Sequence, residues 1–254
     1  MQGDEKMNEL IMKLKDHMKK IQQYQTIENL LYWDLATMTP EKGVDSKAEA
    51  IGYFSTEAFR LSTSEEYGAL LRELSSPENY EALDDAIKVT VRRELRDYER
   101  FCRVPEDFYT EYVTLKARSQ KAWETAKKAS DFSIYCPYLD KIILMTKQYV
   151  RYMEPDQKPY EVLLDMFEEG IDSQTIDHLF KELKEGLRPL LKKIHQSGQP
   201  DLSAMKGTYP VSGQKKLQDM LLSYMGFDFT KGTTAESEHP FTSEIGYGDI
   251  RITN

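Results

Sequence analysis

The stretch MNELIMKLKDHMKKIQQYQTIENLLYWDLATMTPEKG, residues 7–43, decides the fold of this chain. Its apolar residues recur every three or four positions, which places them on one side of an α-helix. The first of them are Met7, Leu10, Ile11, Leu14, Met18 and Ile21. The pattern continues to Trp33, and Pro40 and Gly43 then end it. A second helical run over 48–61 predicts a returning arm, so the chain begins with a helical hairpin.

Helices are predicted along most of the remaining chain. Turn-forming sequences separate them at SSPEN (75–79), VPED (104–107), YCP (135–137) and EPDQKP (154–159). Asp172 or Ser173 is expected to cap the next long helix. Its apolar spacing continues past Pro189, so we expect a local kink there and not a break. A shorter helix is predicted over 213–225, with Gly226 in a left-handed conformation at its end.

The pattern changes from helical to alternating near the C-terminus. The segments FDF (227–229) and DIRIT (249–253) alternate apolar and polar residues, as strands do. We therefore predict an all-α, mainly helical fold with a short β element near the C-terminus. Its predicted parts are a helical body over 1–225, which includes the N-terminal hairpin 4–61, and a C-terminal segment over 226–254 that carries the strand.

The composition is that of an ordinary globular protein, with 40% hydrophobic and 30% charged residues among 254. The net charge of −9 argues against a nucleic-acid partner, since such proteins usually carry a basic face. No apolar run approaches the ~20 residues that cross a bilayer, and the first residues lack the layout of a signal peptide. We therefore expect a cytoplasmic protein with no membrane partner. Lysine-rich clusters such as 13–20 and Lys127-Lys128 are predicted to be solvent-facing helix surfaces.

The histidines do not form a metal-binding pattern. His17, His178, His195 and His239 include no pair at helical or turn spacing, so the helical body offers no metal site and no catalytic group. His239 precedes Pro240, which keeps it out of the helical region of backbone space. Its ring could point at a fixed target, or it could be a histidine that is hydrogen-bonded within a loop.

The C-terminal strand has one wholly polar face. In an extended chain Asp249, Arg251 and Thr253 share one side, and Ile250 and Ile252 share the other. Such a strand can pack its isoleucines on a core and present its polar side to a cleft. The alternative is a surface strand whose Asp–Arg pair serves only solubility.

Two short motifs in this region resemble signatures of the Taq-type metallocarboxypeptidases, the thermostable carboxypeptidase family. They are the His-Pro-Phe motif at His239, Pro240 and Phe241, and the Asp-x-Arg-x-Thr motif at Asp249, Arg251 and Thr253. The segments LLYWDLATMTPEKG (30–43) and PYEVLLDMFEEGIDSQTIDHLFKELKEGLRPLL (159–191) are also similar to segments of that family. The resemblance covers nearly the whole chain, as the N-terminal half of a family member.

The resemblance implies a zincin-like, mostly helical fold with a small sheet beside a cleft. In that family the zinc is held by an HEXXH helix and a later glutamate, and both follow the Asp-x-Arg-x-Thr strand. In an HEXXH enzyme the glutamate takes a proton from a zinc-bound water that attacks the scissile carbonyl. No HEXXH occurs in this sequence. We therefore expect zinc only in the complete enzyme, and we expect this segment alone to contain no catalytic residue, to bind no metal and to be inactive.

For the complete enzyme, the resemblance implies release of C-terminal residues from a peptide substrate. His239, Pro240 and Phe241 would then shape the substrate end of the cleft, and the polar strand residues named above would line it. A homodimer is compatible with this reading. The alternative is a non-catalytic helical module that binds a peptide or a protein. That module would cover all its apolar faces, whereas an N-terminal half would expose the apolar surface on which the remaining half packs.

Overall fold

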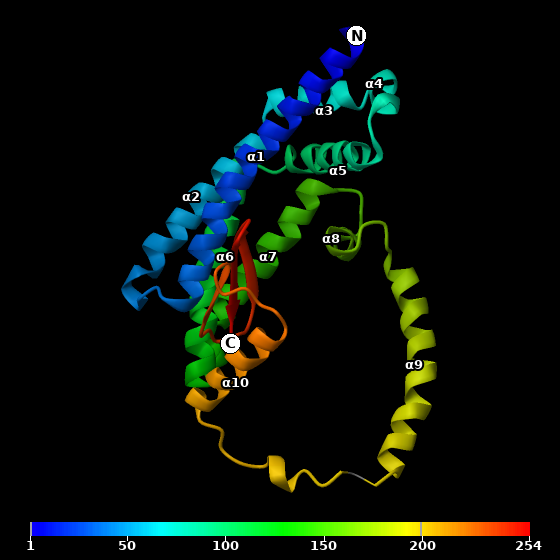
Figure 1. Ribbon diagram of the computed structural model, residues 1–254. Coiled ribbons are helices and arrows are strands. Elements are labelled where there is room, and N and C mark those ends of the chain that lie inside the picture. Colours follow the sequence, from blue (N-terminus) through cyan, green and yellow to red (C-terminus); the bar gives the residue numbers. More distant parts are fainter. Residues whose placement is uncertain (1, 199) are drawn as a thin grey trace. The chain divides into compact units, whose positions relative to one another are not determined.

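The computed structural model describes residues 2–198 and 200–254, and most of these lie in helices (Figure 1). The α-helices are α1 (Gln2–Thr37), α2 (Val44–Ser62), α3 (Glu65–Leu74), α4 (Pro77–Ala82), α5 (Asp85–Phe101), α6 (Glu106–Ala129), α7 (Cys136–Met153), α8 (Pro159–Phe167), α9 (Ser173–Gln196) and α10 (Val211–Tyr224). The strands are β1 (Gly232–Ala235), β2 (Thr242–Gly246) and β3 (Asp249–Thr253). The predicted fold class, mainly helical with a short β element near the C-terminus, is confirmed.

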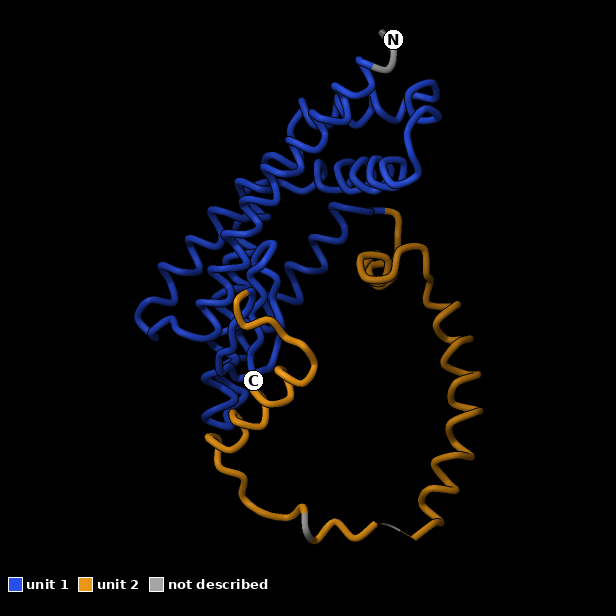
Figure 2. The backbone as a smooth tube through the Cα atoms, in the orientation of Figure 1, with its two compact units in different colours: residues 1–155, 231–254 blue, residues 156–230 orange. Residues whose placement is uncertain are grey.

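The chain forms two compact units (Figure 2). The first consists of Met1–Pro155 and Lys231–Asn254, and it contains α1 to α7 together with the sheet. The second is Asp156–Thr230, and it contains α8 to α10. The division into a helical body and a C-terminal segment, which was drawn from sequence patterns, remains a prediction.

The N-terminal hairpin is present, and α1 and α2 pack along each other (Figure 1). Polar groups close the turn between them. The side chain of Asp34, near the end of α1, accepts a hydrogen bond from Thr39 Oγ1 at 2.7 Å and pairs with Lys47 Nζ at 2.7 Å. The hydrogen bonds from Lys47 and Thr39 lower the pKa of Asp34. Asp34 therefore holds the turn of the hairpin.

The first half of α1 packs on α3 and α5 through a cluster of buried side chains. Its members are Leu10, Leu14, Ile21, Tyr67, Leu71, Leu74, Leu83 and Val91. His17 belongs to the same interface, since its ring stacks on Tyr67 with centroids 4.2 Å apart and its Nε2 lies 2.9 Å from the carbonyl oxygen of Leu61. Gly68 allows a close approach of the Tyr98 ring, because a Cβ at this position would lie 2.2 Å from that ring and the ring would have to shift.

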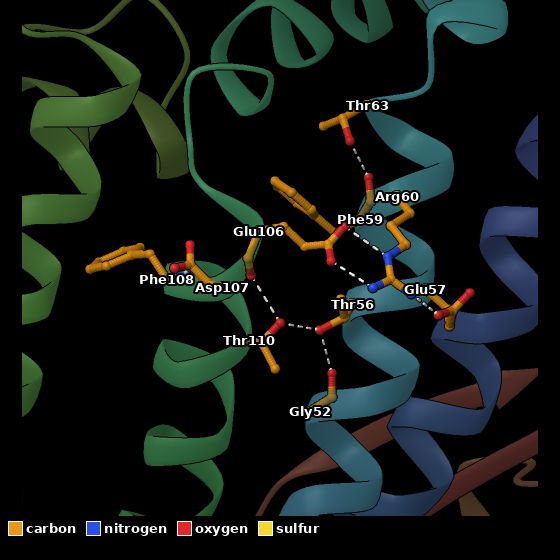
Figure 3. A network of polar contacts seen from close by, with 10 residues as sticks. All are labelled: Gly52, Thr56, Glu57, Phe59, Arg60, Thr63, Glu106, Asp107, Phe108 and Thr110. Carbon is orange, nitrogen blue, oxygen red and sulfur yellow. Dashed lines mark hydrogen bonds and ion pairs between the residues drawn. The ribbon is translucent and has the colours of Figure 1, made fainter.

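Helices α2 and α6 are held together by packing and by a polar network (Figure 3). The hydroxyls of Thr56 and Thr110 lie 2.7 Å apart, and Thr56 also donates to the carbonyl oxygen of Gly52 at 2.7 Å. One turn further along, Arg60 donates to both carboxylate oxygens of Glu106, at 2.7 and 2.6 Å. These contacts hold α6 beside the N-terminal hairpin, and α6 supplies one wall of the site described below.

The sheet has the order β1-β3-β2, with β3 in the centre. Strand β3 pairs parallel with β1 and antiparallel with β2, and Arg251 lies opposite Thr233 on one side and Ser243 on the other. The register shifts near Gly246, and Gly248 in the turn before β3 has a φ of +80°, which favours glycine. Neither outer strand was predicted from the sequence.

The sequence predicted several local features of the second unit correctly. Asp172 caps α9 by accepting a hydrogen bond from the backbone N–H of Thr175 at 2.8 Å, and α9 continues through Pro189. Gly226 has a φ of +82°, as expected after α10. The strand expected at FDF was wrong. Phe227 and Phe229 lie in a loop, because no strand of the described residues pairs with this segment, and their rings pack edge to face with centroids 5.0 Å apart. Within the described residues, no helix is long and apolar enough to span a bilayer.

Candidate functional site

Arg251 joins the C-terminal strand to the first helix. Its Nε and Nη2 donate to Oδ1 and Oδ2 of Asp249 at 2.9 and 2.8 Å, and its guanidinium carbon lies 4.7 Å from the ring centroid of the buried Trp33. The bidentate pair with Asp249 fixes the orientation of the guanidinium. A cation that lies above an indole ring is attracted to the electron-rich face of that ring. The hydrogen bonds from Arg251 hold the pKa of Asp249 below its usual value.

The polar and apolar faces of β3 are not buried in the way that the sequence suggested. Arg251 lies against α1 through Trp33, and Thr253 is buried, whereas Ile250 on the apolar face is exposed. Of the two alternatives left open by the sequence, packing of the isoleucines on a core therefore does not hold for Ile250. Asp249 and Arg251 pair with each other, and Thr253 bonds to the backbone of Phe241, so the polar side of the strand can lie against the protein without unpaired charges.

Thr253 ties the two sequence motifs together. Its Oγ1 accepts a hydrogen bond from the backbone N–H of Phe241 at 2.8 Å, and its backbone N–H donates to the carbonyl oxygen of Phe241 at 2.8 Å. Ser237 Oγ lies 2.7 Å from Thr253 Oγ1 and 2.8 Å from the carbonyl oxygen of His239, so its single proton can serve either acceptor. The last residue of the Asp-x-Arg-x-Thr motif thus fixes the backbone of the His-Pro-Phe motif.

Two lysines at the end of α6 hold the same loop from the other side. Lys128 Nζ lies 2.9 Å from Glu238 Oε1, and Lys127 Nζ donates to the carbonyl oxygen of Glu238. Lys127 Nζ is also 5.3 Å from the ring centroid of Trp123. The pKa of Glu238 is lowered, chiefly by the hydrogen bond from Lys128. Lys127 and Lys128 are exposed, as predicted, and they also contact the residue immediately before His239.

A pocket of about 780 Å³ lies between α1, α6 and this loop, within the first unit. Four of its lining residues are aromatic, and the rest are mostly polar. The lining residues are Glu28, Asn29, Tyr32 and Ala36 from α1, Lys116, Ser119, Gln120 and Trp123 from α6, Tyr135, His239, Phe241 and Ser243. Aromatic walls with a few polar groups are typical of a site that binds an organic ligand.

Glu28 is the carboxylate of the pocket, and burial raises its pKa above the usual value. The nearby Ser55 hydroxyl and the charge of Lys116 offset part of that rise. Burial also raises the pKa of Tyr32, and the charge of Glu28 adds to this effect. The pocket therefore holds its acidic group in a partly desolvated position beside one cation and one phenol.

The six residues predicted as cleft residues fall into two groups. His239 and Phe241 line the pocket, and Pro240 lies between them in the chain. The other three belong to β3 and contact neighbouring protein groups as described above; they are Asp249, Arg251 and Thr253. A role for any of the six in substrate binding remains a prediction.

No sequence pattern singled out the individual helical residues that line the pocket. Glu28 and Tyr32 are one helical turn apart on α1, and Lys116 and Trp123 are two turns apart on α6. Each pair looks like part of an ordinary helix face. Only the packing of α6 beside the hairpin brings them to one pocket.

The family model described as "Carboxypeptidase Taq (M32) metallopeptidase" matches residues 13–254. The chain belongs to this family. It is 37% identical over 239 residues to "Carboxypeptidase 1" of Bacillus subtilis (strain 168), an alignment that covers 94% of this chain and 47% of the relative. It is 30% identical over 249 residues to "Thermostable carboxypeptidase 1" of Pyrococcus furiosus, with 97% and 49% covered. The chain thus spans about half the length of these M32 relatives.

Solved structures of M32 proteins share the fold. The structure titled "BsuCP Crystal Structure" matches with a TM-score of 0.90 and 36% identity over 96% of this chain and 49% of the other. The "Structure of Pyrococcus furiosus Carboxypeptidase Apo-Mg" matches with a TM-score of 0.78 and 30% identity over the same share of each chain. The resemblance seen in the sequence is therefore confirmed at the level of family and fold.

Membership in a metallopeptidase family implies a metal, but the residues present do not fit a zinc centre. Among the described residues, no three His, Cys, Asp or Glu side chains lie close enough together to hold a metal ion. The full sequence contains no HEXXH. Among the described residues that line the pocket, Glu28 and His239 are the side chains of these types, which are fewer than the three protein ligands of a catalytic zinc.

Proposed function

We propose that this chain is the N-terminal portion of a zinc-dependent carboxypeptidase that releases C-terminal residues from peptides when it is complete. The observation that carries the proposal is the M32 family match over residues 13–254 combined with coverage of about half of each relative. The zinc would be held by residues outside this chain. A cytoplasmic location and the oligomeric state remain predictions.

In this proposal the pocket of the first unit receives part of the peptide. Its four aromatic rings offer apolar contact area, and Asn29, Gln120 and Ser243 offer amide and hydroxyl groups to a peptide backbone. His239 and Phe241 would contact the peptide directly. The β3 residues would act mainly by fixing the loop, since Thr253 is bonded to Phe241.

The first test measures zinc content and peptidase activity of the 254-residue chain. We expect less than stoichiometric zinc by atomic emission and no release of C-terminal amino acids from short peptides. Stoichiometric zinc together with turnover would show that the segment is a complete catalyst and would refute this part of the proposal.

The second test concerns the pocket. We expect short peptides to shift the NMR signal of the Trp123 indole, and Phe241→Ala to weaken that binding by about tenfold, which corresponds to about 1.4 kcal/mol. Tyr247→Ala is the matched control, because Tyr247 lies in the turn between β2 and β3 and is fully exposed. If both variants lose peptide affinity equally, or if the unmodified chain binds no peptide, the pocket is not the peptide-binding site.

The alternative of a self-standing binding module has no supporting observation. It requires that the apolar faces be covered, but large apolar side chains of α9 and α10 are about half exposed or more. The relatives found by sequence and by structure are carboxypeptidases.

A further inference from the structure

Glu28 is a half-buried carboxylate without a cation bound to it. It lines the pocket of the first unit, and burial raises its pKa, so the surrounding protein does not fully compensate its charge. Among the described residues, no lysine, arginine or histidine forms an ion pair with Glu28. A partly desolvated charge is stabilised by a partner of opposite sign, so a cationic group of a ligand would find a free partner here.

Lys116 also lines the pocket, but its ammonium group is held by a different residue. Its Nζ lies 5.4 Å from the ring centroid of Tyr112, which is one helical turn earlier on α6. A cation above a phenol ring is attracted to the electron-rich face of that ring. The charge of Lys116 therefore acts on Glu28 only from a distance.

Ser55 on α2 is the other polar group near Glu28. Its Oγ is fully buried and has no hydrogen-bond partner of ordinary geometry among the described residues. A hydroxyl can donate one proton, whereas an ionised carboxylate can accept about four hydrogen bonds. Ser55 therefore leaves most of the accepting capacity of Glu28 open to a ligand.

Aromatic rings provide the apolar part of the same pocket. Tyr32 follows Glu28 by one turn of α1, and Trp123, Tyr135 and Phe241 also line the pocket. Lysine and arginine side chains combine an apolar stem with a charged end, and a cation is attracted to aromatic faces. An uncharged apolar side chain would contact the rings but leave Glu28 unpaired, and a carboxylate would be repelled by Glu28.

We propose that Glu28 is a specificity-determining residue, which makes the pocket select peptides by pairing with a cationic group. A lysine or arginine side chain fits this pocket best, because its stem can lie on the rings while its charged end reaches Glu28. The amino terminus of a peptide has the same charge, so the experiment separates these two sources. The inference rests on the proposed function, in which the pocket receives part of a peptide.

The experiment measures peptide binding to the 254-residue chain through the NMR signal of the Trp123 indole. Short N-acetylated alanine peptides carry a single lysine at each position in turn. The reference peptides carry norleucine instead, which has the same stem without the ammonium group. A norleucine peptide with a free amino terminus tests the amino terminus as the source of the cation.

The variant is Glu28→Gln, which keeps the shape of the side chain and removes its charge. Its matched control is Glu244→Gln, because Glu244 is an exposed carboxylate next to the pocket residue Ser243 and is not among the described residues that line the pocket. Both variants change the net charge by the same amount. Helix content and the unfolding midpoint are compared in all three proteins, so that a loss of binding is not mistaken for a loss of folding.

We expect the best lysine peptide to bind the unmodified chain at least about tenfold more tightly than its norleucine counterpart, which is typical of one hydrogen bond to a charged group. Glu244→Gln should keep this preference, and Glu28→Gln should abolish it with little change in the affinity for norleucine peptides. This comparison is a double-mutant cycle between Glu28 and the ammonium group of the ligand. A lysine preference that survives in Glu28→Gln would overturn the proposal.

The remaining outcomes separate this inference from the proposed function. If lysine and norleucine peptides bind equally and Phe241→Ala weakens both, the pocket binds peptides but Glu28 does not select them, and only this inference is wrong. If the norleucine peptide with a free amino terminus binds as tightly as the lysine peptides, and only when Glu28 is present, the selected cation is the amino terminus. If no peptide shifts the Trp123 signal, the peptide-binding role of the pocket is refuted together with the role of Glu28.

Discussion

The hydroxyl of Thr253 is the most informative single group to remove, because it connects the two motifs at the pocket. In Thr253→Val the side chain keeps its shape but loses Oγ1. The backbone N–H of Phe241 then loses its acceptor at 2.8 Å, and Ser237 loses one of its two nearby acceptors. The carbonyl oxygen of Phe241 keeps its bond from the backbone N–H of residue 253. The main consequence is one unsatisfied, partly buried amide.

The size of the effect follows from that amide. A buried donor left without an acceptor costs about 1–3 kcal/mol. Ser237 adds little, since its proton can turn to the carbonyl oxygen of His239 at 2.8 Å. A local loss of about 2 kcal/mol corresponds to roughly 30-fold faster hydrogen exchange of the Phe241 amide, if exchange proceeds by local opening. The effect should be confined to the loop and to the ends of β2 and β3.

The assay is amide exchange followed by NMR in Thr253→Val and Thr253→Ser. The serine variant keeps the hydroxyl and loses only a methyl group, so its Phe241 amide should exchange at nearly the original rate. If the valine variant leaves this amide unchanged, or if both variants accelerate it equally, the hydroxyl does not hold the loop and the proposed link between the motifs is wrong.

Three further perturbations test other parts of the structure. Arg251→Gln should raise the carboxyl titration midpoint of Asp249 towards its ordinary value, because the hydrogen bonds that lower the pKa are lost. In the unmodified chain, the stabilisation from this pair is fully present above the ordinary pKa of an aspartate. It disappears as the pH falls through the lowered pKa of Asp249. Glu28→Gln should increase the free energy of unfolding at pH 7 and have little effect at pH 4, because the raised pKa means that ionisation of this buried carboxyl costs stability as pH rises. Gly68→Ala should lower the free energy of unfolding by about 1–3 kcal/mol, because the new Cβ would meet the Tyr98 ring at 2.2 Å.

Each of these has a contradicting result. An unchanged Asp249 midpoint would mean that Arg251 does not pair with it in solution. A Glu28→Gln effect of equal size at both pH values would mean that shape and not charge is responsible. For Gly68→Ala, addition of Tyr98→Leu should restore part of the loss, and purely additive losses would show that the two residues do not clash.

The sequence predicted the helices well because their signals are local. The apolar spacing of α1 and the breakers after it, the Asp172 cap of α9 and the left-handed Gly226 are each determined by neighbouring residues. The outer strands β1 and β2 gave no such signal. GTTA and TSEIG have little apolar alternation, and they are strands because β3 offers them backbone partners. FDF shows the converse, since no described strand pairs with it and it forms a loop.

The candidate site was predictable only where it coincides with motifs. His239 and Phe241 were singled out from the sequence, and both line the pocket. Glu28 and Trp123 could not be found in this way, because residues nearly a hundred positions apart meet only through the packing of α1 and α6. Helix periodicity identifies which side of a helix is apolar. It does not identify which residues of another helix will lie across the pocket from a given polar residue.

The contacts of the two motifs assign them different tasks. Asp249 and Arg251 pair with each other, Arg251 lies over the ring of Trp33, and Thr253 bonds to the backbone of Phe241, so each of the three side chains already has a partner within the protein. His239 and Phe241 face the pocket, and the flanking Glu238 is held by two lysines. A side chain whose polar atoms are already paired can contact a ligand only by giving up those bonds, at a cost similar to the gain. The strand motif is therefore better suited to position the loop, and the loop to touch a ligand.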